Sequence, residues 1–183
     1  MKNEFLNNRV IVKVGDITQE NTDVIANAAN STLLGGGGVD GAIHLFGGKQ
    51  ILEECREIRR TQWPHGLPTG EAVLTTGGLL PARYVIHTVG PVYGLNEGRD
   101  AELLGACYRN SLKLAVERGI TTIAFPSIST GAYRYPRDKA ALVSSRAVAD
   151  VLNKEFLILE VRLVFFSPDD SRVFLSNQQL ERL

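Results

Sequence analysis

The chain has 183 residues, of which 44% are hydrophobic and 22% charged, values close to those of average globular domains. This composition excludes a disordered or collagen-like chain. Twenty Lys and Arg residues balance twenty Asp and Glu residues, so the formal net charge is zero. That balance gives no support to a nucleic-acid or membrane partner, because such partners usually leave a basic excess. A small anionic ligand held by backbone amides stays open.

The length predicts a single domain spanning residues 1–183. No apolar run is long enough for a transmembrane helix, and the first residues do not resemble a secretory signal, so we expect a cytoplasmic protein. Cys55 and Cys107 each fall on the apolar side of a helix-like segment and are expected to be reduced core thiols. The histidines are scattered along the sequence, and we predict neither a metal site nor a cofactor.

Short β-rich runs alternate with segments of helical periodicity. The β-rich runs are Val10–Val14, Asp23–Asn27, Ala72–Thr76, Tyr84–Val89, Thr121–Phe125 and Val161–Phe166. Apolar residues recur at helical steps over 51–58, 104–115 and 141–152, with a further helix expected at about 39–46. Several of the β-rich runs lack polar alternation, as strands covered on both faces do. The pattern predicts an α/β fold with three α/β/α layers and a mixed, largely parallel central sheet.

Three loops that follow predicted strands are rich in Gly, Ser, Asn and Asp. They read Gly15-Asp16-Ile17-Thr18, then Asn30-Ser31 followed by the run Gly35–Gly38, and Pro126–Tyr133. Ligands of such folds bind beyond the carboxyl ends of the strands, so these loops predict a nucleotide-sized site at one edge of the sheet. The glycine run is either a flexible surface loop or a close approach of amides to an anion, aided by the next helix. Two amide-rich loops facing each other suit a diphosphate.

Several side chains in these loops admit both a structural and a functional interpretation. Asp16 is either a turn former or an acceptor for an exocyclic amine, which would favour adenine over guanine or hypoxanthine. Asp40 is either a helix-start residue or a group that orients or deprotonates water, with Asn30 holding a sugar hydroxyl. Tyr133 is either a half-buried aromatic or a cover for a ribose. Phe166 either stacks on a base or fills the core.

His44 and His87 are interpreted as satisfied structural histidines rather than catalysts.

Six strings of the sequence, in this order, resemble the macrodomains, the ADP-ribose-binding fold, and within them the MacroD-type branch common in bacteria. The strings are Gly15–Thr18, Asn27–Ser31, Gly35–His44 (GGGGVDGAIH), Pro68–Ala72, His87–Pro91 and Phe125–Pro136 (FPSISTGAYRYP). The similarity covers about residues 10–135. It implies a hydrolase that removes ADP-ribose from modified Asp or Glu side chains and deacetylates O-acetyl-ADP-ribose, without a metal. Its partners would be ADP-ribose, O-acetyl-ADP-ribose and mono-ADP-ribosylated proteins.

The resemblance also implies roles for individual residues. Asp16 and the backbone amide of Ile17 would hold adenine, and Asn30 would contact the distal ribose. Asp40 would be the catalytic carboxylate, assisted by Asn30. The diphosphate and distal ribose would lie along Gly37, Gly38, Val39 and Asp40 on one side and along Ser129, Thr130, Gly131, Ala132 and Tyr133 on the other, with Phe166 near the base.

The sequence departs from the family pattern in places. Arg134 stands where similar proteins commonly have Gly, Ala132 replaces a larger aliphatic residue, and Leu45-Phe46 replaces the usual Arg-Ala. Arg134 is expected to narrow the mouth of the site or to add a cation beside the phosphates. The alternatives to a hydrolase are a non-catalytic ADP-ribose reader and, more remotely, an unrelated α/β protein with a phosphate–sugar ligand. Asp40 is the feature that favours the enzyme, since binding-only relatives often lack it.

Overall fold

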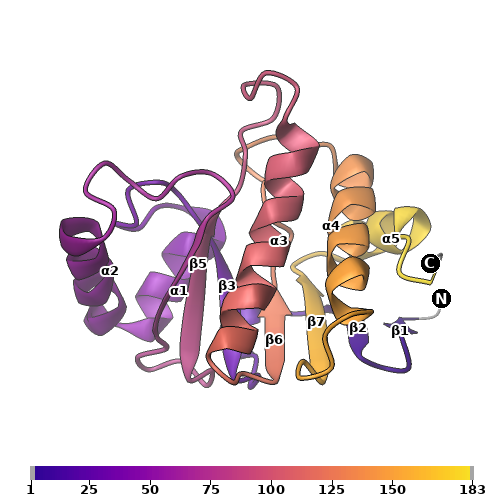
Figure 1. Cartoon of the computed structure of the whole chain (residues 1–183), viewed down its shortest axis with the longest axis horizontal. Coiled ribbons are helices and arrows are strands. Elements are labelled where there is room, and N and C mark those ends of the chain that lie inside the picture. Colours follow the sequence, from indigo (N-terminus) through magenta and orange to yellow (C-terminus); the bar gives the residue numbers. More distant parts are fainter. Residues whose placement is uncertain (1–2, 182–183) are drawn as a thin grey trace.

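A computed structural model of the chain describes residues 3–181, and within them one sheet of seven strands. The strands are β1 (Glu4–Phe5), β2 (Val10–Val14), β3 (Val24–Ala29), β4 (Ala72–Thr76), β5 (Tyr84–Val89), β6 (Thr122–Phe125) and β7 (Glu160–Phe165). Their order across the sheet is β1-β2-β7-β6-β3-β5-β4 (Figure 1). The five central strands run parallel, whereas β1 and β4 pair antiparallel at the two edges. The predicted mixed, largely parallel sheet is confirmed.

Five α-helices and one short 3-10 helix connect the strands of the described chain. They are η1 (Ile17–Gln19), α1 (Gly38–Gly47), α2 (Lys49–Thr61), α3 (Asp100–Glu117), α4 (Arg137–Leu152) and α5 (Pro168–Asn177). The sequence predicted the first four α-helices but not α5. A start signal for α5 was nevertheless present, because Ser167 caps the helix by accepting a hydrogen bond from Asp170 N and Pro168 occupies its first turn.

The sheet has a hydrophobic core on each face, so the chain forms three layers. Alternate residues of one strand enter different cores: Val24 and Ala26 pack with residues of α3, α4 and α5, and Ile25 packs with residues of α1 and α2. Burial on both faces explains why the strand sequences lack polar alternation. The predicted three-layer α/β/α fold is confirmed. No helix within residues 3–181 is long and apolar enough to cross a membrane.

The parallel arrangement decides where a site can form. Because β2, β7, β6, β3 and β5 all point the same way, the loops that follow them emerge at one edge of the sheet (Figure 1). Loops at the carboxyl ends of parallel strands are the usual place for a ligand in such folds. The functional residues are therefore expected at this edge.

Candidate functional site

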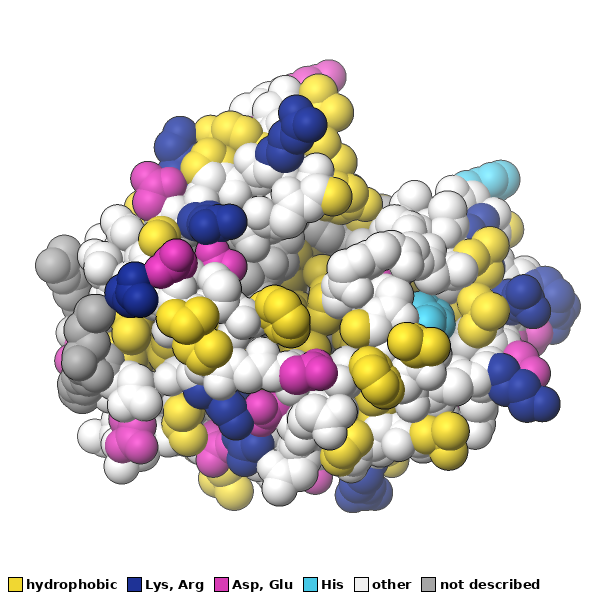
Figure 2. Space-filling model, turned by 180° about the vertical axis from the view of Figure 1, so that it is seen from behind, with side chains coloured by type: hydrophobic (Ala, Val, Ile, Leu, Met, Phe, Trp, Pro, Cys, Tyr) yellow, Lys and Arg dark blue, Asp and Glu magenta, His cyan; other side chains and the backbone are white. Residues whose placement is uncertain are grey.

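A cleft of about 800 Å³ lies at the carboxyl edge of the sheet, a volume in the range of small-molecule sites. Every one of the five parallel strands contributes to it, directly or through the loop that follows. In Figure 2 the molecule is hollowed in its upper half, between two raised parts. The cleft is lined by residues of 15–17, 28–30, 36–40, Ala42, Phe46, Gly90, 126–127, 129–133, 164–166 and Asp170.

All thirteen site residues expected from the sequence line this one cleft. They are Asp16, Ile17, Asn30, Gly37, Gly38, Val39, Asp40, Ser129, Thr130, Gly131, Ala132, Tyr133 and Phe166. The sequence did not point to Phe46, Gly90 or Asp170 as site residues, and it indicated Gly36 only as part of the glycine run. The position of Gly90 directly after β5 was a usable signal, because this strand ends at the same edge as the others.

Two sets of backbone amides face the cleft without a protein partner. The first set is the N-terminus of α1, whose cap residue Gly37 provides no side-chain hydrogen bond. The second is the loop after β6, where Ser129 adopts a left-handed φ of 66° and Tyr135 N donates to Ser129 O over 2.9 Å. Within residues 3–181, none of the amides from 38 to 40 or from 130 to 133 donates a hydrogen bond to the protein backbone. Free amides of this kind bind phosphate groups.

The electrostatics of the cleft depend on these amides. Among the described residues that line it, none is Lys or Arg, and three are aspartates: Asp16, Asp40 and Asp170. An anion in the cleft is therefore held by main-chain N–H groups and by the positive end of the α1 dipole. This arrangement agrees with a chain of zero net charge.

Asp40 and Asn30 converge over Gly36. A Cβ atom placed on Gly36 would lie 3.0 Å from Asp40 Oδ2 and 3.1 Å from Asn30 Nδ2, so both polar atoms border the same small space. Asp40 lies in the first turn of α1, and Asn30 directly follows β3. Asn30 Nδ2 donates one hydrogen to Gly35 O over 3.0 Å, which leaves its second hydrogen for a ligand. The lack of a side chain at Gly36 lets these two polar atoms come close to its backbone from both sides.

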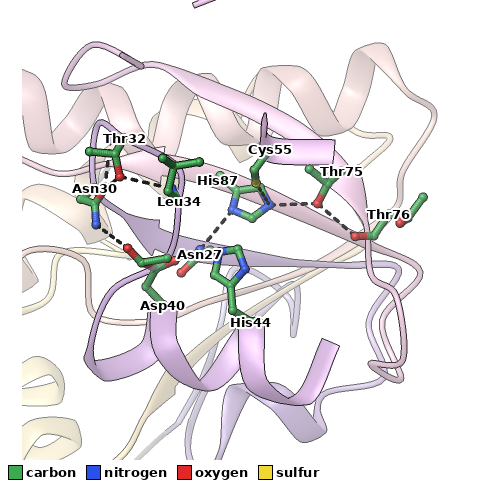
Figure 3. A network of polar contacts seen from close by, with 11 residues as sticks. Asn27, Asn30, Thr32, Leu34, Asp40, His44, Cys55, Thr75, Thr76 and His87 are labelled. Carbon is green, nitrogen blue, oxygen red and sulfur yellow. Dashed lines mark hydrogen bonds and ion pairs between the residues drawn. The ribbon is translucent and has the colours of Figure 1, made fainter. Parts of the chain in front are cut away.

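The other carboxylate oxygen of Asp40 faces the interior. Oδ1 accepts a hydrogen bond from Asn27 Nδ2 over 2.7 Å and lies 3.5 Å from His44 Nε2 (Figure 3). Asp40 is 5% exposed, and the burial of so polar a side chain requires hydrogen-bond partners. Its two oxygens therefore have different surroundings, one fixed by the core and one directed to the cleft.

The fold brings together residues that are scattered in the sequence. His44, Cys55 and His87 have ligand-type atoms within 4.8 Å of one another, directly behind Asp40. Burial, then Asp40 and Glu54, raises the pKa of the Cys55 thiol to about 12, and its sulfur lies 3.8 Å from His87 Nε2. Both ring nitrogens of His87 already have partners, Asn27 and Thr75. We interpret Cys55 and His87 as members of a hydrogen-bond network rather than as ligands of a metal ion.

The expectation of satisfied structural histidines is correct for His87 and wrong for His44. His87 is fully buried and hydrogen-bonded at both nitrogens. His44 has two buried ring nitrogens with no hydrogen bond among the described residues, although Nε2 lies 3.5 Å from Asp40 Oδ1. Both cysteines are free and buried, as expected.

Asp16 fulfils its structural role and keeps an oxygen for a ligand. Its Oδ1 accepts hydrogen bonds from Thr18 N over 2.9 Å and Thr18 Oγ1 over 2.7 Å, which caps η1. Within the described chain, Oδ2 has no such partner, and the side chain is exposed at the cleft. The two interpretations of Asp16 are therefore compatible, since they use different oxygens.

Phe166 and Tyr133 line the cleft, whereas Arg134 does not. Phe166 is 86% exposed and lines the cleft, so it does not fill the core. Tyr133 is half-buried, and its carbonyl accepts a hydrogen bond from Tyr93 N. Arg134 is exposed and is not among the cleft-lining residues, so the expected narrowing of the mouth is not seen. Its φ of 57° lies in the left-handed region, which glycine adopts more readily than arginine.

The fold and the cleft define an α/β protein with a nucleotide-sized site whose anion donors are main-chain amides. A sequence model described as the macro domain matches residues 26–144, and the chain belongs to the macro domain family. The O-acetyl-ADP-ribose deacetylase of Escherichia fergusonii is 48% identical over 169 residues, which are 92% of this chain and 94% of that protein. An uncharacterized protein of Thermoplasma volcanium is 51% identical over 173 residues, 94% of this chain and 91% of that protein.

Solved structures support the same assignment. A mutant of the Oceanobacillus iheyensis macrodomain with ADPR superposes with a TM-score of 0.91 at 43% identity, covering 97% of this chain and 95% of that one. The Trypanosoma brucei macrodomain in complex with ADP-ribose gives a TM-score of 0.84 at 37% identity, covering 92% of this chain and 68% of that one. The resemblance drawn from the sequence is thus confirmed at the level of family and fold.

Proposed function

We propose that this macrodomain binds ADP-ribose and hydrolyses esters on its distal ribose. The substrates would be O-acetyl-ADP-ribose and proteins that carry mono-ADP-ribose on Asp or Glu side chains. The observation that carries the proposal is the convergence of Asp40 Oδ2 and Asn30 Nδ2 over Gly36, inside a cleft walled by free amides. Support comes from the relative named O-acetyl-ADP-ribose deacetylase and from the similar macrodomains that carry ADP-ribose in their structures.

The proposed binding mode follows the chemistry of the cleft from end to end. Asp16 Oδ2 accepts a hydrogen bond from the adenine amine, the amide of Ile17 contacts the same base, and Phe166 stacks on it. The diphosphate lies between the two sets of free amides, at the N-terminus of α1 and in the loop after β6. The distal ribose reaches Asn30 and is covered by Tyr133.

The proposed reaction is the attack of water on the acyl carbon of the ester. Asp40 Oδ2 orients the water and accepts its proton, while Asn30 donates a hydrogen bond to a ribose hydroxyl. The bond between the acyl carbon and the ribose oxygen breaks, and the ribose oxygen takes up a proton. The products are a carboxylic acid and ADP-ribose. Fixing the diphosphate by two loops supplies the orientation that the attack needs.

The test compares wild type with Asp40→Ala and with the isosteric Asp40→Asn. We expect turnover on O-acetyl-ADP-ribose to fall by about a hundredfold or more in both variants. Calorimetric affinity for ADP-ribose should be mostly kept, because the amides and Asp16 are untouched. A wild-type chain that binds ADP-ribose but hydrolyses neither O-acetyl-ADP-ribose nor an Asp- or Glu-linked conjugate would be a reader module instead.

A further inference from the structure

We propose that Thr75, His87 and Asn27 form a directed chain of hydrogen bonds that fixes the Asp40 carboxylate, with Asn27 as its positioning residue. The inference rests on the proposed function, in which Asp40 activates water. Figure 3 shows the chain running from the carbonyl of Thr76, through these three side chains, to Asp40. Of the residues in this hydrogen-bond chain, Asp40 lines the cleft, whereas Thr75, His87 and Asn27 do not.

The direction of the chain starts at Thr75. Its hydroxyl has a single hydrogen, which it donates to Thr76 O over 3.0 Å. Its oxygen also lies 2.9 Å from His87 Nε2, so in that contact the oxygen accepts and Nε2 carries the hydrogen. This contact and the amide of Asn27 at the other ring nitrogen favour the same neutral form of the imidazole ring.

The His87 ring donates from one nitrogen and accepts at the other. Its side chain is completely buried, and burial, reinforced by His44 and opposed by Asp40, lowers its pKa to about 3. The ring is therefore neutral near pH 7 and carries one hydrogen only. Because that hydrogen is on Nε2, the other nitrogen, Nδ1, is an acceptor.

Asn27 is the link to the carboxylate. Its Nδ2 lies 3.1 Å from His87 Nδ1 and 2.7 Å from Asp40 Oδ1, so its two hydrogens serve two acceptors. Turning the amide over would place its carbonyl oxygen against a carboxylate oxygen and a ring lone pair, which repel it. The chain thus permits one orientation of the amide.

Asn27 holds Asp40 at a cost in folding stability, which supports a positioning role for Asn27. Among residues 3–181, Asn27 Oδ1 has no hydrogen-bond partner although it is buried. An unpaired buried carbonyl opposes folding. An apolar residue at this position would avoid that penalty but would leave Asp40 Oδ1 without its strongest donor.

The sheet supplies a rigid base for the chain. Asn27 on β3 lies opposite His87 on β5, and Thr75 on β4 is a diagonal neighbour of His87, so the three side chains share one face. The chain therefore ties Asp40, in the first turn of α1, to three adjacent strands. With Oδ1 held inward, Oδ2 keeps its position beside Asn30 Nδ2, over Gly36.

The test removes the hydroxyl that sets the direction. Thr75→Val deletes it at nearly constant volume, and Thr75→Ser keeps it. The matched control is Thr88→Val, which removes an equally buried hydroxyl that donates to Glu71 O, on β5 but outside the chain. The readouts are kcat and KM on O-acetyl-ADP-ribose, the affinity for ADP-ribose, and the hydrogen position on His87 by ¹⁵N NMR of the imidazole.

We expect wild type to show the hydrogen of His87 on Nε2. In Thr75→Val, the NMR spectrum should no longer show this single form of the His87 ring, and kcat should fall about tenfold. KM and the affinity for ADP-ribose should be nearly unchanged. Thr75→Ser should restore both the NMR signature and kcat, and Thr88→Val should resemble wild type in both. Asn27→Ala should lower kcat further than Thr75→Val while it still binds ADP-ribose.

Two results would overturn the inference: a wild-type His87 that carries its hydrogen on Nδ1, or equal kcat in Thr75→Val and Thr88→Val. These differ from failure of the proposed function, which would show as absent turnover in wild type on every ester. If the Thr75→Val variant does not fold, the NMR spectrum of wild-type His87 and the kcat of Asn27→Ala test the inference instead.

Discussion

Asp16 and Thr18 are joined by two hydrogen bonds that both end on the same carboxylate oxygen, Oδ1 of Asp16. The second oxygen is left for the cleft, which separates the capping role of this side chain from its proposed contact with a base. A substitution can therefore change the second role and spare the first.

Asp16→Asn provides that separation. The amide oxygen can still accept from Thr18, but the group presented to the base becomes an N–H donor. We expect ADP-ribose to bind about 1.5–3 kcal/mol more weakly, because a donor then faces the adenine amine. Inosine diphosphate ribose, which offers an oxygen at this position, should gain relative to ADP-ribose. Calorimetry with both ligands measures the ratio, and an unchanged ratio would remove Asp16 from base recognition.

Asp16→Ala is the companion variant. It should weaken ADP-ribose and lose discrimination between the two bases without reversing it. A lower melting temperature is also expected, because the cap of η1 is lost.

Gly36→Ala tests the space between Asp40 and Asn30. The added methyl group would lie 3.0 Å from Asp40 Oδ2 and 3.1 Å from Asn30 Nδ2, closer than unstrained contacts. It would push the two side chains apart, so turnover should fall by about tenfold or more. ADP-ribose affinity should change much less, since the amides from 38 to 40 stay in place. Equal turnover in wild type and variant would show that the reacting water lies elsewhere.

The buried neutral state of His87 predicts a dependence of stability on pH. Burial lowers the pKa of His87 from 6.5 to about 3, so between these values the unfolded chain binds a proton that the folded chain does not. The free energy of unfolding should therefore fall as the pH is lowered from about 6.5 toward 3, by up to about 1.4 kcal/mol per unit from this group. Urea unfolding at several pH values measures the slope.

The control for this prediction is a second histidine. His87→Gln should show a smaller slope over the same range, whatever its absolute stability. His65 is exposed, so His65→Gln should keep the slope of wild type. If all three chains gave the same slope, His87 would be protonated in the folded state at these pH values.

Substitution of Arg9, which is not among the residues that line the cleft, is expected to lower the free energy of unfolding. Its guanidinium donates four hydrogen bonds to the carbonyls of Leu152, Glu155 and Ile158, and so fastens the start of β2 to the segment between α4 and β7. Lysine cannot reproduce this planar set of donors. Arg9→Lys should lower the free energy of unfolding by about 1.5–3 kcal/mol and leave ADP-ribose affinity unchanged.

Arg60→Lys is the matched control for Arg9→Lys. Arg60 is exposed and pairs with Glu57 on the same helix, and such surface pairs contribute little to stability. Chemical denaturation that found equal losses in both variants would contradict the proposed role of Arg9.

Most of the site was predictable because of its topology. The loops after Val14, Ala29 and Phe125 are separated in sequence, yet parallel strands in one sheet must end at a common edge. The polar residues that follow those strands therefore meet whatever the details of packing. The two-residue strand β1 had no detectable pattern, because two residues show no periodicity.

The surroundings of Asp40 were not predictable in the same way. The sequence alone determined the five parallel strands, the loops that follow three of them and thirteen of the residues that line the cleft, since these follow from local patterns and from the shared direction of the strands. Only the tertiary structure decided that Asn27, His87 and Thr75 form a chain behind Asp40. That contact depends on β3, β5 and β4 becoming neighbours in a particular register. Pairing between distant strands is set by packing of the whole core, which no local pattern encodes.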